Sequence, residues 1–97
     1  MRSTDPSSKF RRDVKRIAKG RYRDIVAVPR GELWEVVNAL ARDIRLPPAY
    51  RDHPLRGDRE GSRECHIRPD LLLVYRYEGE EWLILERLGS HAEIFGM

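Results

Sequence analysis

Hydrophobic residues change their spacing once along this chain, near residue 46, and the change separates a helical half from a strand half. In the first half apolar residues recur every three or four positions, as on one side of an α-helix. Two such stripes are present: Phe10, Val14 and Ile17, and then Leu33, Val37, Leu40 and Ile44. The sequence therefore predicts two amphipathic helices joined by a short connection.

The residues around the two stripes indicate where the helices begin and end. Ser7 or Ser8 can cap the first helix, and Gly20 is a plausible terminator. Pro29 suits the first turn of the second helix, which we expect to end before Leu46-Pro47-Pro48. Residues 24–28 are ambiguous, and residues 1–8 indicate a loose start or a short edge strand.

Beyond residue 50 the pattern becomes typical of strands. We expect a short strand over 51–56, an alternating strand over 62–68, and a strand over 71–77 that is apolar on both faces, as in a central strand covered on both sides. A return strand over 81–88 follows the turn at 78–80. Ser90 and Glu93 have the spacing of a capping box, which predicts a short terminal helix.

This order of elements predicts an α+β fold in one domain spanning residues 1–97. A helical hairpin packs on one face of a small antiparallel β-sheet, and a short C-terminal helix follows. The chain has 97 residues, of which 40% are hydrophobic and 36% charged, which fits one globular core.

Several classes of protein are disfavoured by the composition. The longest strongly apolar run, residues 71–75, is far shorter than the roughly 20 residues of a membrane helix. No signal-peptide core follows the N-terminus, so we expect a cytoplasmic protein and no membrane partner. Cys65 is the only cysteine, which excludes an internal disulfide, and its place in the alternating strand indicates a core thiol.

Positive charge is concentrated at the N-terminus. Residues 1–23 contain nine Lys or Arg and two Asp, whereas the rest contains ten against fourteen acidic residues. A basic face attracts polyanions largely independently of their sequence. Nucleic acid is therefore a plausible partner, although a solvated helix face would look the same.

All three histidines lie in the strand half, next to charged or turn-forming residues. Hairpin pairing brings Asp70, Arg87 and His91 to one end of the sheet, with His66 a few residues away and His53 on the flanking strand. An acid, a cation and imidazoles at one rim fit metal-free RNA cleavage. A base takes the proton of the ribose 2′-OH, a cation stabilises the phosphorane, and an acid protonates the leaving 5′ oxygen.

Each of these residues also has a purely structural interpretation, as a turn histidine, a turn aspartate or a cross-strand ion pair. A zinc site from the three histidines and a carboxylate is a minor alternative, because the spacing 53, 66 and 91 contains no close pair. We therefore predict no metal and no cofactor.

The strand half resembles the YafQ branch of the RelE/ParE toxin superfamily. The resemblance rests on the run from Leu46-Pro47-Pro48 to Tyr50-Arg51-Asp52-His53-Pro54-Leu55, then Gly61 with residues 63–67, then Pro69-Asp70, and finally residues 86–91 closing on Phe95. The similarity covers about residues 9–96. It implies a helical hairpin on an antiparallel sheet and an endoribonuclease, the toxin of a type II toxin–antitoxin pair.

The resemblance also implies roles and partners. His91 and Asp70 become the leading proton-transfer groups, Arg87 the phosphate clamp, and His53 and His66 supports or alternates. Phe95 would contact or order the substrate, and Arg63, Lys15 and Arg12 are further candidates for binding it. The implied partners are mRNA, the A site of the 30S ribosomal subunit and a cognate antitoxin, with operator DNA reached only through the antitoxin.

Two departures from the family pattern keep alternatives open. Leu71 stands where family members often have Trp, and the connection over residues 24–31 is longer and more broken than expected. One alternative is a non-enzymatic, ParE-like toxin that inhibits a protein such as DNA gyrase. Another is a degenerate toxin that acts only as an antitoxin-bound, DNA-binding co-repressor.

Overall fold

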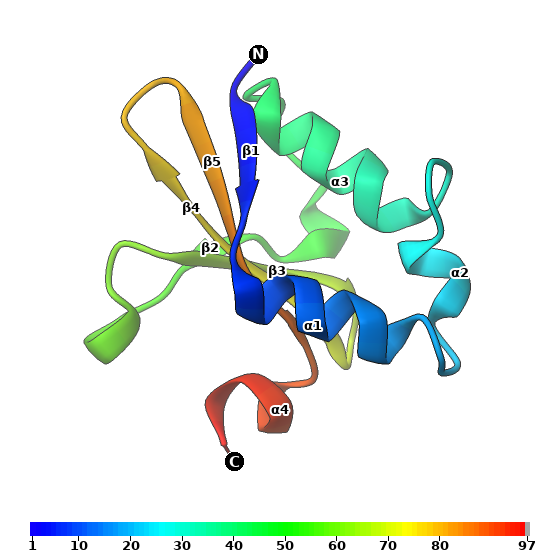
Figure 1. The fold of residues 1–97 in the computed structure, drawn as a ribbon. Coiled ribbons are helices and arrows are strands. Elements are labelled where there is room, and N and C mark those ends of the chain that lie inside the picture. Colours follow the sequence, from blue (N-terminus) through cyan, green and yellow to red (C-terminus); the bar gives the residue numbers. More distant parts are fainter. Residues whose placement is uncertain (97) are drawn as a thin grey trace.

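A five-stranded sheet forms the centre of the computed structural model, which describes residues 1–96, and four helices surround it (Figure 1). In chain order the elements are β1 (Ser3–Pro6), α1 (Ser8–Ile17), α2 (Arg23–Val26), α3 (Glu32–Ala41), β2 (His53–Pro54), β3 (Arg63–Arg68), β4 (Leu71–Glu78), β5 (Trp82–Gly89) and α4 (His91–Phe95). Two 3₁₀ turns, Pro48–Tyr50 and Gly57–Arg59, flank β2. The predicted α+β fold is confirmed.

The sheet has the strand order β1-β5-β4-β3-β2, and every pairing is antiparallel except that of β1 with β5. Residues 3–6 thus form the edge strand that was one of the two expectations for the N-terminus, and their parallel pairing makes the sheet mixed rather than antiparallel. β2 has only two residues instead of the expected six. Arg51, just before it, is in the left-handed region at φ 50°, which interrupts an extended strand.

Helices α1, α2 and α3 pack on one face of the sheet, and α4 packs on the other (Figure 1). The larger core includes Phe10, Leu33, Leu73 and Leu85, all at most 2% exposed. A smaller cluster joins Leu72 and Val74 to Ile94 on the opposite face. β4 is therefore covered on both sides, as its apolar run predicts, and Cys65 is buried in the larger core.

Helix α1 forms where the first stripe predicts it. The Ser7 hydroxyl accepts from the Phe10 N–H at 3.0 Å, which satisfies one free donor of the first turn. Phe10 and Ile17 are buried, and Val14 packs beside them. Between them lies Asp13, a carboxylate only 2% exposed.

Helix α3 is shorter than the second stripe predicts, so two boundary assignments were wrong. The helix begins at Glu32 with Gly31 as its N-cap, so Pro29 lies outside it. Gly31 is required because a Cβ there would lie 2.2 Å from the Ile25 carbonyl oxygen. At the other end Asp43 takes φ 57°, which ends the helical path and leaves Ile44 54% exposed.

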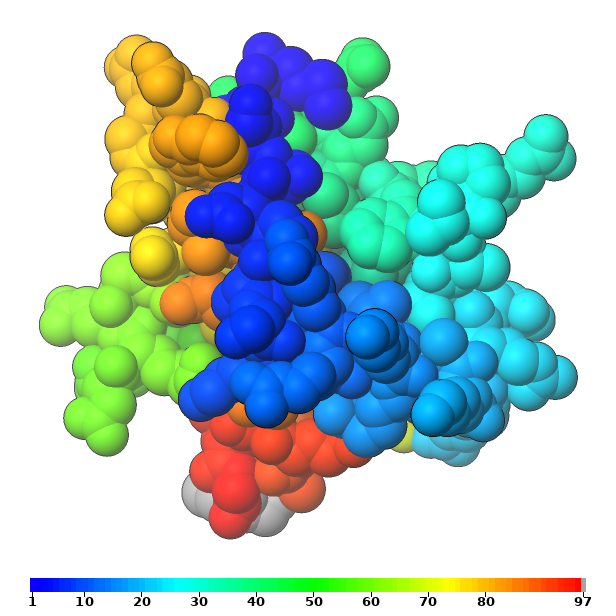
Figure 2. Space-filling model, viewed as in Figure 1, coloured from blue at the N-terminus to red at the C-terminus, as the bar shows by residue number. Residues whose placement is uncertain are grey.

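Side chains of α1 and of its N-cap, Ser7, bond to the edge of β5 beyond the end of β1. The Ser7 hydroxyl donates to the Glu86 carbonyl at 2.8 Å, and the Leu88 N–H donates to Asp13 Oδ2 at 2.9 Å. Arg16 Nη2 donates to the Leu88 carbonyl at 3.2 Å. Figure 2 shows β1 and α1, in blue, running one after the other across the face of the molecule. The free edge of β5 is thus protected by a helix rather than by another strand.

No helix within residues 1–96 is both long enough and apolar enough to cross a membrane.

Candidate active site

The α4 face of the sheet carries three of the candidate residues, His53, His66 and Arg87, in two neighbouring rows. Strand register aligns His53, Glu64, Val74 and Arg87 in one row, and His66, Leu72 and Gly89 in the next. Leu72 and Val74 contact Ile94 of α4 and form an apolar floor. Two imidazoles and a guanidinium therefore surround an apolar patch on one face of the sheet.

An irregularity in β5 determines which way Arg87 faces. Val74 pairs with Arg87 but Tyr75 pairs with Leu85, so Glu86 is an extra residue in the ladder. Leu85 and Leu88 both lie in the larger core, which leaves Glu86 and Arg87 between them on the α4 side. Glu86 accepts from the Ser62 hydroxyl and lies 3.6 Å from Arg76. Such bulges redirect side chains and are common beside active sites.

Glu64 joins the two histidines of this face. Its Oε2 lies 2.9 Å from His53 Nε2 and 3.7 Å from His66 Nε2, and the ring centroids are 6.2 Å apart. His53 Nδ1 also lies 3.1 Å from the Pro54 carbonyl, so both its ring nitrogens face acceptors. Glu64 is 6% exposed, and within residues 1–96 its Oε1 and His66 Nδ1 are buried without a hydrogen-bond partner.

The same three side chains are the group in residues 1–96 that could hold a metal ion. One ligand atom from each of His53, Glu64 and His66 lies within 4.8 Å of the others. Two imidazoles and a carboxylate match the ligands that zinc prefers. The sequence indicated, as a minor alternative, a zinc site made of all three histidines and a carboxylate. His91, however, is on α4 and lies outside this group.

Arg87 is held by a carboxylate of α1. Its Nε and Nη2 lie 2.8 Å and 3.2 Å from the two oxygens of Asp13, and Arg16 Nη1 contacts Asp13 Oδ1 at 2.8 Å. Burial alone would raise the pKa of Asp13. The hydrogen bonds from Arg87, the Leu88 N–H and Arg16 outweigh burial, so the pKa lies below its ordinary value. Asp13 also raises the pKa of Arg87, mainly through the hydrogen bond between them.

Asp70 lies in the turn between β3 and β4, and its carboxylate is engaged by the start of the α2 region. The Tyr22 hydroxyl and the Arg21 guanidinium both bond to it. The Tyr22 hydrogen bond is the largest cause that lowers the pKa of Asp70, and Arg21 adds to it. Asp70 is therefore an ionised, exposed carboxylate whose orientation is set from another element.

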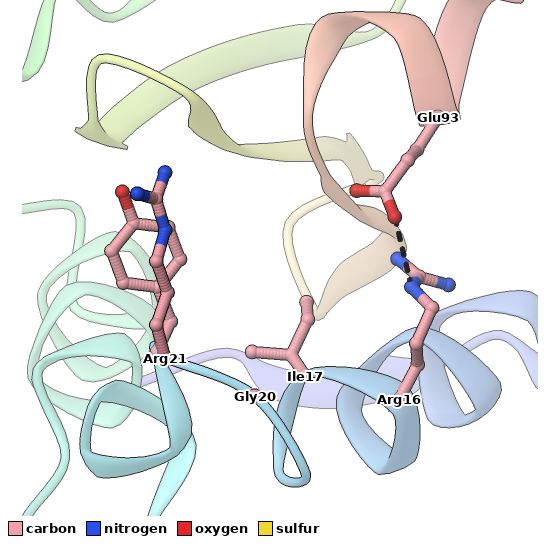
Figure 3. Close-up of a pocket in the computed structure, with 6 residues that line it drawn as sticks. Arg16, Ile17, Gly20, Arg21 and Glu93 are labelled. Atoms are coloured by element: carbon pink, nitrogen blue, oxygen red, sulfur yellow. Dashed lines mark ion pairs between the residues drawn. The ribbon is translucent and has the colours of Figure 1, made fainter.

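Helix α4 presents His91 and Phe95 together. Their ring centroids are 4.6 Å apart, and the Arg59 guanidinium lies 5.2 Å from the centre of the Phe95 ring. The capping box of Ser90 and Glu93 is present, as the sequence predicts. Glu93 also forms an ion pair with Arg16 at 3.0 Å, which ties α4 to α1 at the edge of a cavity of about 170 Å³ (Figure 3).

The remaining substrate-binding candidates are placed differently. Arg63 faces the helices, where its Nε lies 3.3 Å from both Asp52 Oδ1 and the Tyr75 hydroxyl. It holds β3 to the segment before β2 and lies on the opposite face from His66. Lys15 and Arg12 are exposed on α1. Arg12 shares a cavity of about 260 Å³ with Lys9, Asp13 and Arg87.

The sequence predicts that Asp70, Arg87 and His91 lie at one end of the sheet. Strand register supports this placement, but the three side chains are not bonded to one another. Leu72 pairs with Gly89, so Asp70 and His91 flank paired ends of β4 and β5. Within residues 1–96 no hydrogen bond or ion pair links Asp70, Arg87 and His91 to one another. Their joint action stays a prediction.

Sequence reasoning left two carboxylates out of the candidate site: Glu64, which it considered only as a structural partner of His66, and Asp13. Alternation along β3 placed Glu64 on the same face as His66, which was a usable signal. Asp13 follows Phe10 by three residues on the apolar stripe, and a charge at such a position indicates a buried partner. Leu71, which stands where family members often have Trp, is 2% exposed and lies in the larger core. This departure therefore affects the core and not the α4 face.

Comparison with known proteins places the chain in one family. Residues 2–96 match the family described as "Bacterial toxin of type II toxin-antitoxin system, YafQ". The chain is 34% identical over 96 residues to the mRNA interferase toxin YafQ of Escherichia coli K12, which covers 98% of this chain and 97% of the relative.

Two solved structures extend the likeness to the fold. A metal-bound toxin from Helicobacter pylori has a TM-score of 0.82 and 43% identity, covering 98% of this chain and all of that one. YafQ in the E. coli DinJ–YafQ complex has a TM-score of 0.80 and 34% identity, with 99% and 100% covered. The fold, the nearly full-length match and the identity agree, and the chain belongs to the YafQ family of bacterial type II toxins.

Proposed function

We propose that this protein is an endoribonuclease that cleaves mRNA as the toxin of a type II toxin–antitoxin system. The observation that carries the proposal is the α4 face, where His53, His66 and Arg87 lie around an apolar floor that is covered by Ile94 of the helix carrying His91. Membership of the family supports the same reaction, as does the similarity to the mRNA interferase toxin YafQ of E. coli.

The reaction needs one proton removed and one supplied across a single phosphate. The ribose 2′-oxygen attacks the adjacent phosphorus as its proton leaves, and the bond to the 5′ oxygen breaks as that oxygen is protonated. The products are a 2′,3′-cyclic phosphate and a 5′-hydroxyl, so the step consumes no cofactor. We assign the two proton transfers to His91 and Asp70, which are both exposed and can reach a bound strand.

The other residues bind and orient the substrate. Arg87 stabilises the charge that develops on the phosphorane, and its fixed guanidinium suits that task. His53 and His66, joined through Glu64, support or replace the leading groups. Phe95 stacks on a base beside His91, and the exposed cations Arg12 and Lys15 attract the backbone.

The proposed setting is the translating ribosome. Cleavage at the A site of the 30S subunit would place the protein in the cytoplasm. A cognate antitoxin would neutralise it, as the DinJ–YafQ complex suggests for a relative. Contact with operator DNA would occur only through that antitoxin.

Mapping the 5′ ends of cellular mRNA after induction without antitoxin tests the proposal. Wild-type protein should arrest growth and produce new 5′ ends within coding regions. His91→Ala, Asp70→Ala and Arg87→Ala should each remove those ends while far-UV circular dichroism stays unchanged. Growth arrest with intact mRNA would instead indicate an inhibitor of a protein target, and the absence of arrest would indicate a co-repressor.

A further inference from the structure

Asp13 is a buried carboxylate that the proposed chemistry leaves without a role. It lies on α1, which carries neither of the proposed proton-transfer groups, and it is only 2% exposed. Its two oxygens accept four hydrogen bonds, from Arg16 Nη1, the Leu88 N–H and two nitrogens of Arg87. A carboxylate this buried and this fully bonded has a fixed orientation.

The bonds to Asp13 also fix the guanidinium of Arg87. Nε and Nη2 both face Asp13, at 2.8 Å and 3.2 Å, so the plane of the group is set by two contacts at once. The third nitrogen, Nη1, makes no hydrogen bond to any group of residues 1–96 and remains available as a donor.

A cavity of about 260 Å³ adjoins this pair, and its lining is mostly cationic. Lys9, Arg12 and Arg87 line it together with Asp13. Asp13 is already bonded to two arginines, so the cavity offers surplus positive charge to an incoming group. An anion with several oxygens, such as a backbone phosphate, fits that chemistry.

We propose that Asp13 is a positioning residue that holds Arg87 toward the cavity lined by Lys9 and Arg12, where a backbone phosphate of the RNA binds. The identity of that phosphate as part of a cleaved mRNA rests on the proposed function. Asp13 touches neither the phosphate nor the reacting atoms and acts only through Arg87.

Asp13 also joins α1 to the edge of β5, so positioning has to be separated both from a simple charge effect and from a structural role. The sign of the change in affinity separates it from charge, and a double-variant cycle with Arg87→Ala separates it from structure. Asp13→Asn removes a negative charge next to a polyanion site, and charge alone would therefore strengthen RNA binding. Loss of positioning would weaken it.

Binding of a fluorescein-labelled, 2′-O-methyl RNA of about ten nucleotides to the purified protein is the first test, since this probe cannot be cleaved. We expect Asp13→Asn to raise the Kd at least about threefold. Glu32→Gln is the matched control, because Glu32 also accepts from an arginine, Arg68, at 2.6 Å but lies away from the cavity. It should leave the Kd within about twofold. Unchanged or tighter binding by Asp13→Asn would overturn the proposal.

A double-variant cycle on the same Kd is the second test, since Arg87→Ala is expected to stop cleavage but still allows binding to be measured. Asp13→Asn should raise the Kd at least about threefold in the wild-type background. In the Arg87→Ala background it should change the Kd less than about twofold, because Asp13 acts through Arg87. A further rise of about threefold or more in that background would mean that Asp13 is only structural. A wild-type protein that leaves mRNA intact would refute the proposed function, and the binding comparison would still decide the role of Asp13.

Discussion

Ile94→Ala should detach α4 from the sheet and stop cleavage without unfolding the rest of the protein. Ile94 is the one buried residue of a five-residue helix, 5% exposed, and it packs on Leu72 and Val74. Because α4 carries both His91 and Phe95, its attachment decides whether the proposed site is assembled.

The expected loss of docking free energy follows from comparing the burial that is lost with the contacts of α4 that would remain. Truncating a buried Ile to Ala costs about 2–5 kcal/mol, and the small cluster on this face favours about 2–3 kcal/mol. That loss shifts the docking equilibrium of α4 about 30- to 150-fold. The capping box stabilises the helix by about 1 kcal/mol, and the half-exposed Arg16–Glu93 pair by at most about 1 kcal/mol. These contacts cannot restore the docked state.

Amide hydrogen exchange measured beside cleavage tests this reasoning. The amides of Ile94 and Gly96, which donate to Ser90 and Ala92, should lose protection while the β4 amides keep theirs. Leu33→Ala is the control. Leu33 is 0% exposed in the larger core, so its truncation should lower global stability but leave cleavage at 25 °C within about twofold. Wild-type cleavage by Ile94→Ala would refute the reasoning.

Three further predictions concern metal, pH and the network behind β2. Zn²⁺ should raise the Tm and slow cleavage by occupying the imidazoles next to Glu64, and His66→Ala should abolish the Tm shift, whereas a chelator should leave cleavage unchanged. The folded pKa of Asp13 lies below 3.8, so its stabilisation is complete above that value and is lost as pH falls through the folded pKa; Asp13→Asn should flatten acid unfolding followed by circular dichroism. Tyr75→Phe should lower the free energy of unfolding in urea by about 1–2 kcal/mol, because the buried hydroxyl donates to Asp52 at 2.6 Å; no change in the urea midpoint would contradict this.

Local pattern was enough to predict most of the fold. The stripe of Phe10 and Ile17, the two apolar faces of residues 71–77 and the spacing of Ser90 and Glu93 each indicate an element by themselves, and each element is present. These predictions are correct because periodicity and capping depend on residues within one turn or one strand.

Boundaries that depend on distant contacts were predicted less well. The start of α3 is set by the close approach of Gly31 to Ile25, and the parallel pairing of β1 depends on β5, about 80 residues later in the chain. A pattern within the second stripe cannot reveal either constraint, and so Pro29 and Ile44 were assigned to a helix that excludes them.

The sequence by itself determined which residue types could perform acid–base chemistry and which segments would carry them. Only the tertiary structure decided their partners: Glu64 between His53 and His66, Asp13 on Arg87, and Tyr22 with Arg21 on Asp70. The physical reason is the distance along the chain over which each property is determined. A strand or helix is specified by neighbours in the chain, whereas the orientation and ionisation of a side chain are set by whichever groups the folded chain brings within a few ångströms.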